Sequence, residues 1–123
     1  MSPKVDGNPE LYGPLTPAVF HVLLALAGED LHGYAILKEV ELRTGGKVRL
    51  STGTLYGIIK RLLADGLIAE LRARPAERED DERRKYYRLT SLGRQLAAAE
   101  AERMDEVLAV ARARHLLKRA RTA

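Results

Sequence analysis

The sequence predicts a mainly α-helical domain with a small β-hairpin, and three observations lead to this fold class. Apolar residues recur at helical spacing in three segments before residue 66 and in one long segment after residue 90. Between these segments the spacing changes to the alternation that is typical of strands. The 123 residues suit a single domain, and their 46% hydrophobic content suffices for a core.

The first helix is expected over residues 17–28. Thr16 is the expected N-cap, and Pro17 takes the first helical position, where a backbone N–H is not needed. This segment is apolar on nearly every side, which predicts a central place in the core. Residues 1–13 contain prolines and glycines but few apolar side chains, and we expect them to form a flexible arm.

Two further helices are expected over about residues 32–44 and 52–65. His32 stands where it can cap the first of them or contact the turn, and Ser51 or Thr52 can cap the second. Each helix is followed by glycine, which readily takes the left-handed conformation found after helix C-termini. These stop signals are Gly45, Gly46 and Gly66.

The segment after the third helix predicts a β-hairpin. Residues 67–74 alternate apolar and charged side chains, interrupted only at Ile68, and residues 83–90 place Tyr87 and Leu89 toward the core. The connection between the two strands is polar, contains Pro75 and is too charged to be buried.

One long helix is expected from a cap at Thr90 to about Lys118. Its stripe of apolar and small residues is longer than so small a domain can cover, so we expect the excess to pack against a partner helix. The chain then divides into a flexible arm (1–13), a winged helix-turn-helix domain (14–90) and a C-terminal dimerisation helix with a frayed basic tail (91–123).

Composition and charge narrow the function classes. The chain has no cysteine, which excludes disulfides and thiolate metal sites. Its net charge of +4 is uneven: residues 1–50 carry a net −1 and the rest +5. A basic half favours an anionic partner such as nucleic acid, with plain solubility as the alternative. There is no secretory signal and no apolar run long enough to span a membrane, so we expect a soluble, cytoplasmic protein.

On the helix at 52–65, the residues opposite the apolar stripe form an unusual face. Gly57 lies within it, although a glycine inside a helix costs about 1 kcal/mol relative to alanine. Small residues let a helix backbone approach another surface closely, and Lys60 and Arg61 at the rim can reach phosphate oxygens. Such a face suits the major groove of DNA. An ordinary solvated face with tolerated glycines is the alternative.

The return strand of the hairpin begins with three cations, Arg83, Arg84 and Lys85. Acidic residues crowd the tip before them, so the hairpin as a whole is nearly neutral. The cation cluster can hold a phosphate or enter a minor groove. A charged hairpin that only improves solubility is the alternative.

Metal sites and catalysis find little support in the sequence. No two of the three histidines, His21, His32 and His115, have the spacing of metal ligands. The carboxylates of the hairpin tip lack a preorganised geometry, and Gly45-Gly46-Lys47 lacks the rest of a P-loop. We therefore expect no metal, no cofactor and no enzymatic activity.

Three segments, "HGYAI", "STGTLYGIIKRL" and "RRKYYRLTSLG", together resemble the PadR family of transcriptional regulators. The resemblance covers about residues 14–117 and is closest to short members that carry a single C-terminal helix. One departure is Ser91, which stands where a proline is common in the family.

The resemblance implies a homodimeric winged-helix repressor of a pseudo-palindromic operator, and some members release DNA when a small aromatic or drug-like effector binds between the subunits. With the face described above, the expected DNA-contacting set is Tyr34, Ser51, Thr52, Thr54, Tyr56, Gly57, Lys60, Arg61, Arg83, Arg84 and Lys85. The expected dimer interface is Phe20, Leu96, Met104, Val107, Leu108 and Ala111. The alternative function is a winged-helix module that dimerises but binds another protein rather than DNA.

Overall fold

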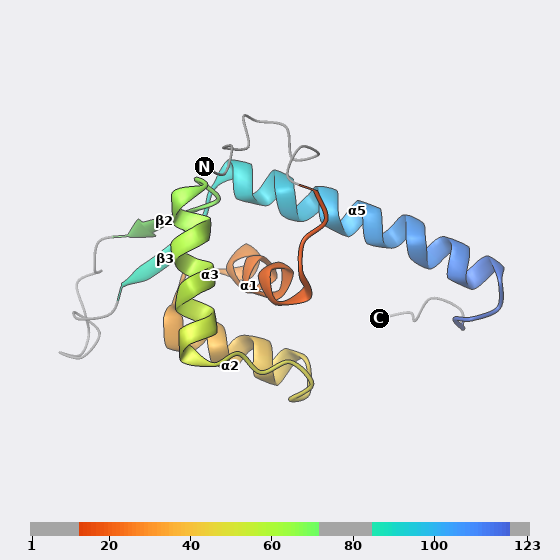
Figure 1. Ribbon diagram of the computed structural model, residues 1–123, viewed down its shortest axis with the longest axis horizontal. Helices are drawn as coiled ribbons and strands as arrows, with labels where there is room; N and C mark the ends of the chain where they lie inside the picture. The colour runs from red at the N-terminus through yellow and green to blue at the C-terminus, as the bar shows by residue number, and fades with distance from the viewer. Residues whose placement is uncertain (1–12, 72–84, 119–123) are drawn as a thin grey trace.

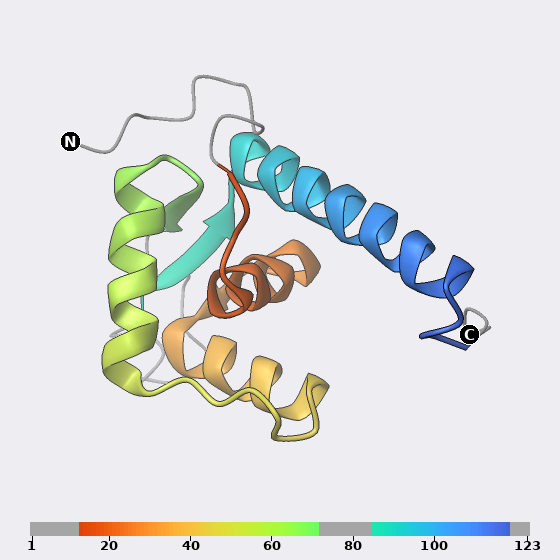
Figure 2. The ribbon, with the colours of Figure 1, turned by 45° about the vertical axis from the view of Figure 1, so that its right-hand side comes forward.

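The computed structural model describes residues 13–71 and 85–118, which form four helices and a three-stranded antiparallel sheet (Figure 1). The elements in chain order are α1 (Pro17–Gly28), β1 (Leu31–His32), α2 (Gly33–Arg43), α3 (Thr52–Ala64), β2 (Ile68–Leu71), β3 (Tyr86–Leu89) and α5 (Ser91–Ala113). α1 lies at the centre, with α3 along one side and α5 crossing the other (Figure 2). The predicted fold class, mainly helical with a small hairpin, is confirmed.

The helices begin where the sequence predicts. The hydroxyl oxygens of Thr16, Ser51 and Thr90 each accept a hydrogen bond from the backbone N–H three residues later. His32 caps α2 in the same manner, since its Nδ1 accepts from the amide of Ala35 at 3.1 Å. Each of these bonds satisfies an amide that has no partner inside its own helix.

Two helices also end at the predicted glycines. Gly45 follows α2 with φ +63°, and Gly66 follows α3 with φ +75°. After Gly66, the amide of Leu67 donates to the carbonyl of Leu62 at 2.9 Å, which closes the last turn of α3. Leu67 is thereby brought into the core, where it is fully buried.

α5 is shorter than predicted, because it ends at Ala113 rather than near Lys118. His115 takes φ +62°, and the amide of Leu116 turns back to the carbonyl of Ala111 at 2.9 Å. This closure stops the helix without a glycine. The apolar residues after Ala113 suggest a continuing helix, which is why the sequence overestimates its length.

The sheet contains one strand more than the sequence predicts. β2 and β3 form the predicted hairpin, with Ile68 opposite Leu89. β1 adds to the other edge of β3 and places Leu31 opposite Tyr87. Two residues are too few to show an alternating pattern, so residues 31–32 were expected only as a loop and a helix start.

α5 is anchored to the domain by its first ten residues. Its buried positions are Gly93, Leu96, Ala97 and Glu100. A Cβ atom at Gly93 would collide with the carbonyl oxygen of Leu67 and lie 2.8 Å from Cδ1 of Leu89, so only glycine allows this close approach. Beyond Glu100 the helix projects past the domain (Figure 1).

Several predictions concern residues that lie outside the described ranges. They include the arm at residues 1–12, the hairpin connection with Pro75, and the last residues of the basic tail. Within the described residues, no helix combines the length and the apolar character that crossing a membrane requires.

Candidate nucleic-acid interface

The outer face of α3 is open and lacks bulky side chains over part of its length. Gly53 and Gly57 are exposed, and a Cβ atom at either position would have no other part of the described chain within 4 Å. Lys60 and Arg61 are exposed on the same helix. Leu55, Ile59 and Leu62 are buried. The separation of a buried apolar stripe from an exposed small-residue face therefore follows the predicted spacing.

Lys60 is the cation on α3 with the greatest freedom to bind an external anion. It makes no ion pair with another described residue, whereas Nε of Arg61 lies 3.9 Å from the carboxylate of Asp65. The side chain of Arg61 is exposed but that of Asp65 is buried, so the pair holds Arg61 toward its own helix. Lys60 is therefore better placed than Arg61 to reach an external anion.

The hydroxyl groups at the start of α3 differ in how available they are to an external partner. Oγ of Ser51 accepts from the amide of Thr54 at 3.0 Å and donates to Oγ1 of Thr54 at 2.9 Å. Ser51 is thus occupied as the N-cap. Thr52 and Thr54 are exposed on the first turn of the helix, so they are the more available donors for an external surface.

Tyr56 links α3 to the start of α2. Its ring lies over Gly33, where a Cβ atom would collide with the tyrosine hydroxyl and approach Cζ to 2.8 Å. Tyr56 keeps 46% of its surface exposed. Sequence reasoning identified Tyr56 as a DNA contact but missed that Gly33 makes room for it; the glycine at the first position of α2 is the signal that could have shown this.

Tyr34 is supported by an aromatic group at the base of the hairpin. Its ring stacks on His32 with centroids 6.5 Å apart, and His32 meets the ring of Tyr86 edge-on at 5.4 Å. Nζ of Lys38 lies 5.4 Å from the centroid of Tyr34. Tyr34 itself remains 57% exposed. Neither His32 nor Tyr86 was predicted in this supporting role.

The predicted wing cluster is described only at one of its three cations. Arg83 and Arg84 lie outside the described residues. Lys85 is exposed, and its Nζ lies 3.6 Å from the carboxylate of Glu70 across the hairpin.

Ion pairs and burial hold the base of the wing in place. Arg88 on β3 donates to Asp30 at 2.8 Å, which fixes β3 against the segment before β1, and these hydrogen bonds raise the pKa of Arg88. Burial raises the pKa of Tyr87, with smaller contributions from the negative charge of Glu70 and from Tyr56. Tyr87 therefore stays neutral at physiological pH.

Arg43 holds α2 against α1. Its guanidinium bonds to both carboxylate oxygens of Glu39, at 2.6 and 2.9 Å, and donates to the carbonyl of His21 at 3.2 Å. Its Nη1 also lies 3.0 Å from Nδ1 of His21. The hydrogen bonds to Glu39 raise the pKa of Arg43, while burial and then the charge of Arg43 lower the pKa of His21. Neutral His21 thus accepts from Arg43.

The residues expected at a dimer interface fall into two groups. Leu96 is 0% exposed within its own chain, so it has no surface to offer a partner, and we correct its assignment from interface to core. Its position in the buried half of α5 is the physical reason. The other expected residues keep exposed or half-exposed surface; they are Phe20, Met104, Val107, Leu108 and Ala111.

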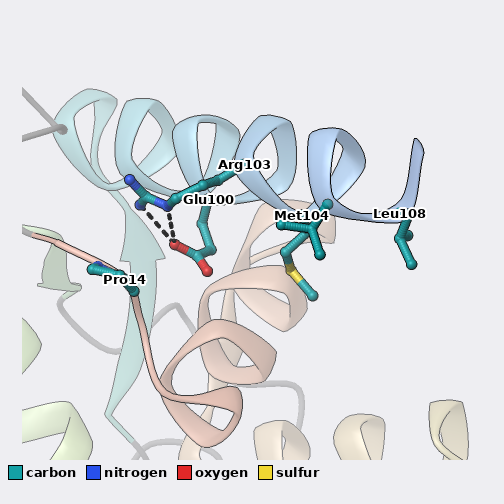
Figure 3. A pocket seen from close by; sticks show the side chains of 6 residues that line it. Pro14, Glu100, Arg103, Met104 and Leu108 are labelled. Atoms are coloured by element: carbon teal, nitrogen blue, oxygen red, sulfur yellow. Dashed lines mark hydrogen bonds and ion pairs between the residues drawn. The ribbon is translucent and has the colours of Figure 1, made fainter. Parts of the chain in front are cut away.

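An open pocket of about 370 Å³ lies beside the exposed half of α5 (Figure 3). Its lining residues are Pro14, Glu100, Arg103, Met104, Val107 and Leu108. The lining is apolar apart from the Glu100–Arg103 ion pair, whose closest atoms are 2.7 Å apart. Within the described ranges, no group of three or more histidine, aspartate or glutamate side chains is arranged to hold a metal ion.

Comparison with known proteins places these features in a family. Residues 22–99 match the model of the transcriptional regulator PadR-like family. The fold is similar to that of a Clostridium thermocellum transcriptional regulator, with TM-score 0.63, 25% identity and coverage of 75% of this chain and 84% of the other. A PadR family regulator of Clostridium difficile gives TM-score 0.61 at 25% identity, covering 76% and 93%.

A more distant neighbour is Bacillus subtilis PadR, which was solved in complex with operator DNA. Its TM-score is 0.57 at 21% identity, with coverage of 68% of this chain and 47% of that chain, so it supports the fold alone. Among curated proteins, a 37.1 kDa protein of a Streptomyces fradiae transposon is 41% identical over 83 residues, and Lysinibacillus sphaericus protein X is 34% identical over 73. These matches cover 68% and 59% of this chain, but only 21% and 64% of those relatives.

Proposed function

The chain belongs to the PadR-like family of transcriptional regulators, and from that membership we propose that it is a homodimeric, sequence-specific DNA-binding repressor. In this proposal α3 enters the major groove, the wing contacts the neighbouring backbone or minor groove, and α5 joins two copies of the chain. The operator is a pseudo-palindrome, because a two-fold dimer presents two equivalent recognition helices.

The outer face of α3 is the observation that carries this proposal. Gly57, which lies inside the helix, costs about 1 kcal/mol of helix propensity relative to alanine. Gly33 and Gly93 make room for neighbouring parts of the chain, but Gly53 and Gly57 make room for nothing in the described residues. An external surface that approaches the helix backbone closely accounts for the cost, and the adjacent Lys60 suits an anionic one.

Membership of a family of transcriptional regulators supports the choice of DNA as that surface. For this chain, the proposal depends on the face of α3, on exposed Tyr34 at the start of α2 and on the cations of the wing.

The exposed half of α5 supports the dimer. Met104, Val107 and Leu108 recur three and four residues apart, so they share one side of the helix. All three are exposed in the single chain. A continuous apolar stripe of this kind is typical of a surface that packs against a partner, and a second copy of α5 provides a matching stripe.

The proposal also includes a small aromatic or drug-like effector, whose binding to the protein releases the protein from DNA. The pocket beside Met104 and Leu108 has a volume of about 370 Å³, within the range of small-molecule sites. It adjoins the proposed dimer surface, so a ligand there can change how two copies pack. A screen of such compounds by calorimetry, followed by a test of DNA release, checks this part separately.

Hydroxyl-radical footprinting on the DNA upstream of the gene tests the main proposal. We expect two protected patches related by two-fold symmetry, about one helical turn apart or a multiple of it. Affinity is expected to fall steeply with salt, because each phosphate contact releases counterions. Uniform weak protection of all DNA would contradict a specific repressor, and no protection at all would favour the alternative, a module that dimerises and binds protein rather than DNA.

A further inference from the structure

We propose that Glu100 is a positioning residue that fixes the angle between α5 and the rest of the domain, and thereby sets the spacing of the two recognition helices. The consequence for spacing rests on the proposed function. The local role rests on the geometry of one chain. Glu100 is 7% exposed and is the last buried residue of α5, immediately before the projecting half of the helix begins.

The carboxylate of Glu100 joins α5 to the segment that leads into α1 (Figure 3). Its Oε1 accepts from the backbone amide of Leu15 at 3.3 Å and from Arg103 at 2.7 and 3.2 Å. Arg103 in turn donates to the carbonyl of Gly13 at 3.4 Å. One buried acid and one arginine therefore hold two backbone groups of the entering chain against α5.

This contact differs in kind from the apolar anchors of α5, and it lies closer to the projecting half than the side-chain hydrogen bond from α5 to α1, which Arg94 donates to the carbonyl of Ala27 at 3.3 Å. Gly93, Leu96 and Ala97 pack against apolar or backbone atoms, and apolar packing resists separation but has no directional preference. Hydrogen bonds depend on angle as well as distance. Leu15 directly precedes Thr16, the N-cap of the central helix α1. The bonds to Glu100 are thus able to fix the rotation of α5 against the core.

The length of the projecting half makes this angle important for two copies on DNA. From Glu100 to Ala113, α5 extends about 20 Å at 1.5 Å per residue. A change of about 10° at Glu100 therefore moves the far end by about 3.4 Å, which equals the rise of about one base pair. Loss of the Glu100 contacts is expected to broaden the range of half-site spacings that the dimer accepts.

The local claim can be tested without DNA. Because the chain has no cysteine, nitroxide labels at Leu42→Cys on α2 and Glu106→Cys on α5 report one distance within a chain, after dilution with unlabelled protein. Both sites are exposed. Glu100→Ala is expected to broaden the distance distribution at least twofold. A distribution as narrow as that of the parent would overturn the proposal.

Two control variants separate positioning from general loss of stability. Glu102→Ala removes an exposed glutamate of the same helix, and Ile36→Val weakens the buried core away from the junction. Both are expected to keep the narrow distribution. A similar broadening in Ile36→Val would overturn the proposal, because Glu100 would then act through stability alone. If Glu100→Ala does not fold, Glu100→Gln takes its place, with a smaller broadening expected.

The consequence for DNA is tested with operators selected from a random library and altered by one inserted base pair. The insertion rotates one half-site by about 35° and is expected to weaken parent binding roughly tenfold. Glu100→Ala is expected to bind both operators within about threefold of each other. Discrimination equal to that of the parent would overturn the inference, whereas failure of the parent to select any operator would overturn the proposed function instead.

Discussion

Two exposed faces of this molecule differ sharply in composition. The outer face of α3 consists of glycine, hydroxyl groups and cations, while the projecting half of α5 exposes methionine, valine and leucine. Neither face is covered by another part of the chain within residues 13–71 and 85–118. A face without bulk but with cations suits a close approach to an anionic surface, and a face of large apolar side chains suits burial. Composition, rather than exposure, thus indicates which class of partner each face binds.

The largest expected effect comes from charging the apolar face. Val107 is 65% exposed, so Val107→Asp is expected to leave the monomer folded while burying a charge in any dimer. We expect the dimer to dissociate at micromolar concentration and operator affinity to fall at least about a hundredfold. Sedimentation velocity measures the first and titration of labelled DNA the second.

Ala109→Asp is the matched control, because it adds the same charge at an exposed position that is off the apolar stripe. It is expected to remain dimeric. If Val107→Asp also remained dimeric, the apolar face of α5 would have another use.

Glycine substitutions compare a glycine that is packed against the chain itself, Gly93, with one that faces open space, Gly57. Gly93→Ala is expected to lower the free energy of unfolding by about 2–3 kcal/mol, because its Cβ would collide with the backbone of Leu67. Gly57→Ala is expected to raise it by up to about 1 kcal/mol, since nothing in the described chain stands in the way. Urea unfolding of both variants measures the difference, and two changes of the same sign would contradict the account.

Filling the outer face of α3 is expected to damage function without damaging the fold. Gly57→Glu places a bulky anion where the proposal puts DNA, so affinity for the operator is expected to fall by more than about tenfold. Ala98→Glu adds the same side chain at an exposed site on α5 and serves as the control. Electrophoretic mobility shift and circular dichroism give the two readouts. Unchanged binding by Gly57→Glu would remove the case for close approach.

Removing one cation is expected to have a smaller and uniform effect. Lys60→Ala is expected to weaken binding severalfold on specific and random DNA alike. The slope of log affinity against log salt is expected to fall by about 0.9, as for one lost phosphate contact. If only specific binding weakened, Lys60 would contact a base instead.

The smallest expected effect lies in the scaffold that supports both faces. The pKa of His21 is lowered in the folded protein, chiefly by burial. The unfolded chain therefore binds a proton that the folded chain does not, and stability is lost as pH falls through the unfolded pKa of about 6.5. We expect parent protein to lose slightly more stability than His21→Gln between pH 7.5 and 5.5 in thermal unfolding. An equal loss would show that His21 does not contribute.

Much of the fold could be predicted from local chemistry. The caps at Thr16, Ser51 and Thr90 and the glycine stops depend on residues next to one another in the chain, and the structure confirms them. The predicted end of α5 was wrong, because a non-glycine residue, His115, takes the left-handed conformation just after the helix. The strand β1 was missed because its pairing with β3 joins residues far apart in the sequence.

The candidate site likewise has features that follow from local sequence and features that depend on contacts between distant elements. The outer face of α3 could be predicted, because the spacing within one helix decides which residues share a side. The support of Tyr56 by Gly33, and the link from Glu100 to Leu15, could not, because each joins two distant elements. The stripe of α5 was predicted to exceed what the domain can cover, but Leu96 was assigned to the exposed part although it is buried, while Val107 is exposed as expected. Only the length of the folded domain shows where that stripe leaves the core.

The affinity of the parent protein for its upstream DNA, compared with random DNA at one fixed salt concentration, tests the central claim most directly. The account predicts that the upstream DNA binds at least about a thousandfold more tightly, as a specific operator does. It also predicts two chains per operator. Equal affinity for the two DNAs would contradict the claim that the outer face of α3 reads a DNA sequence.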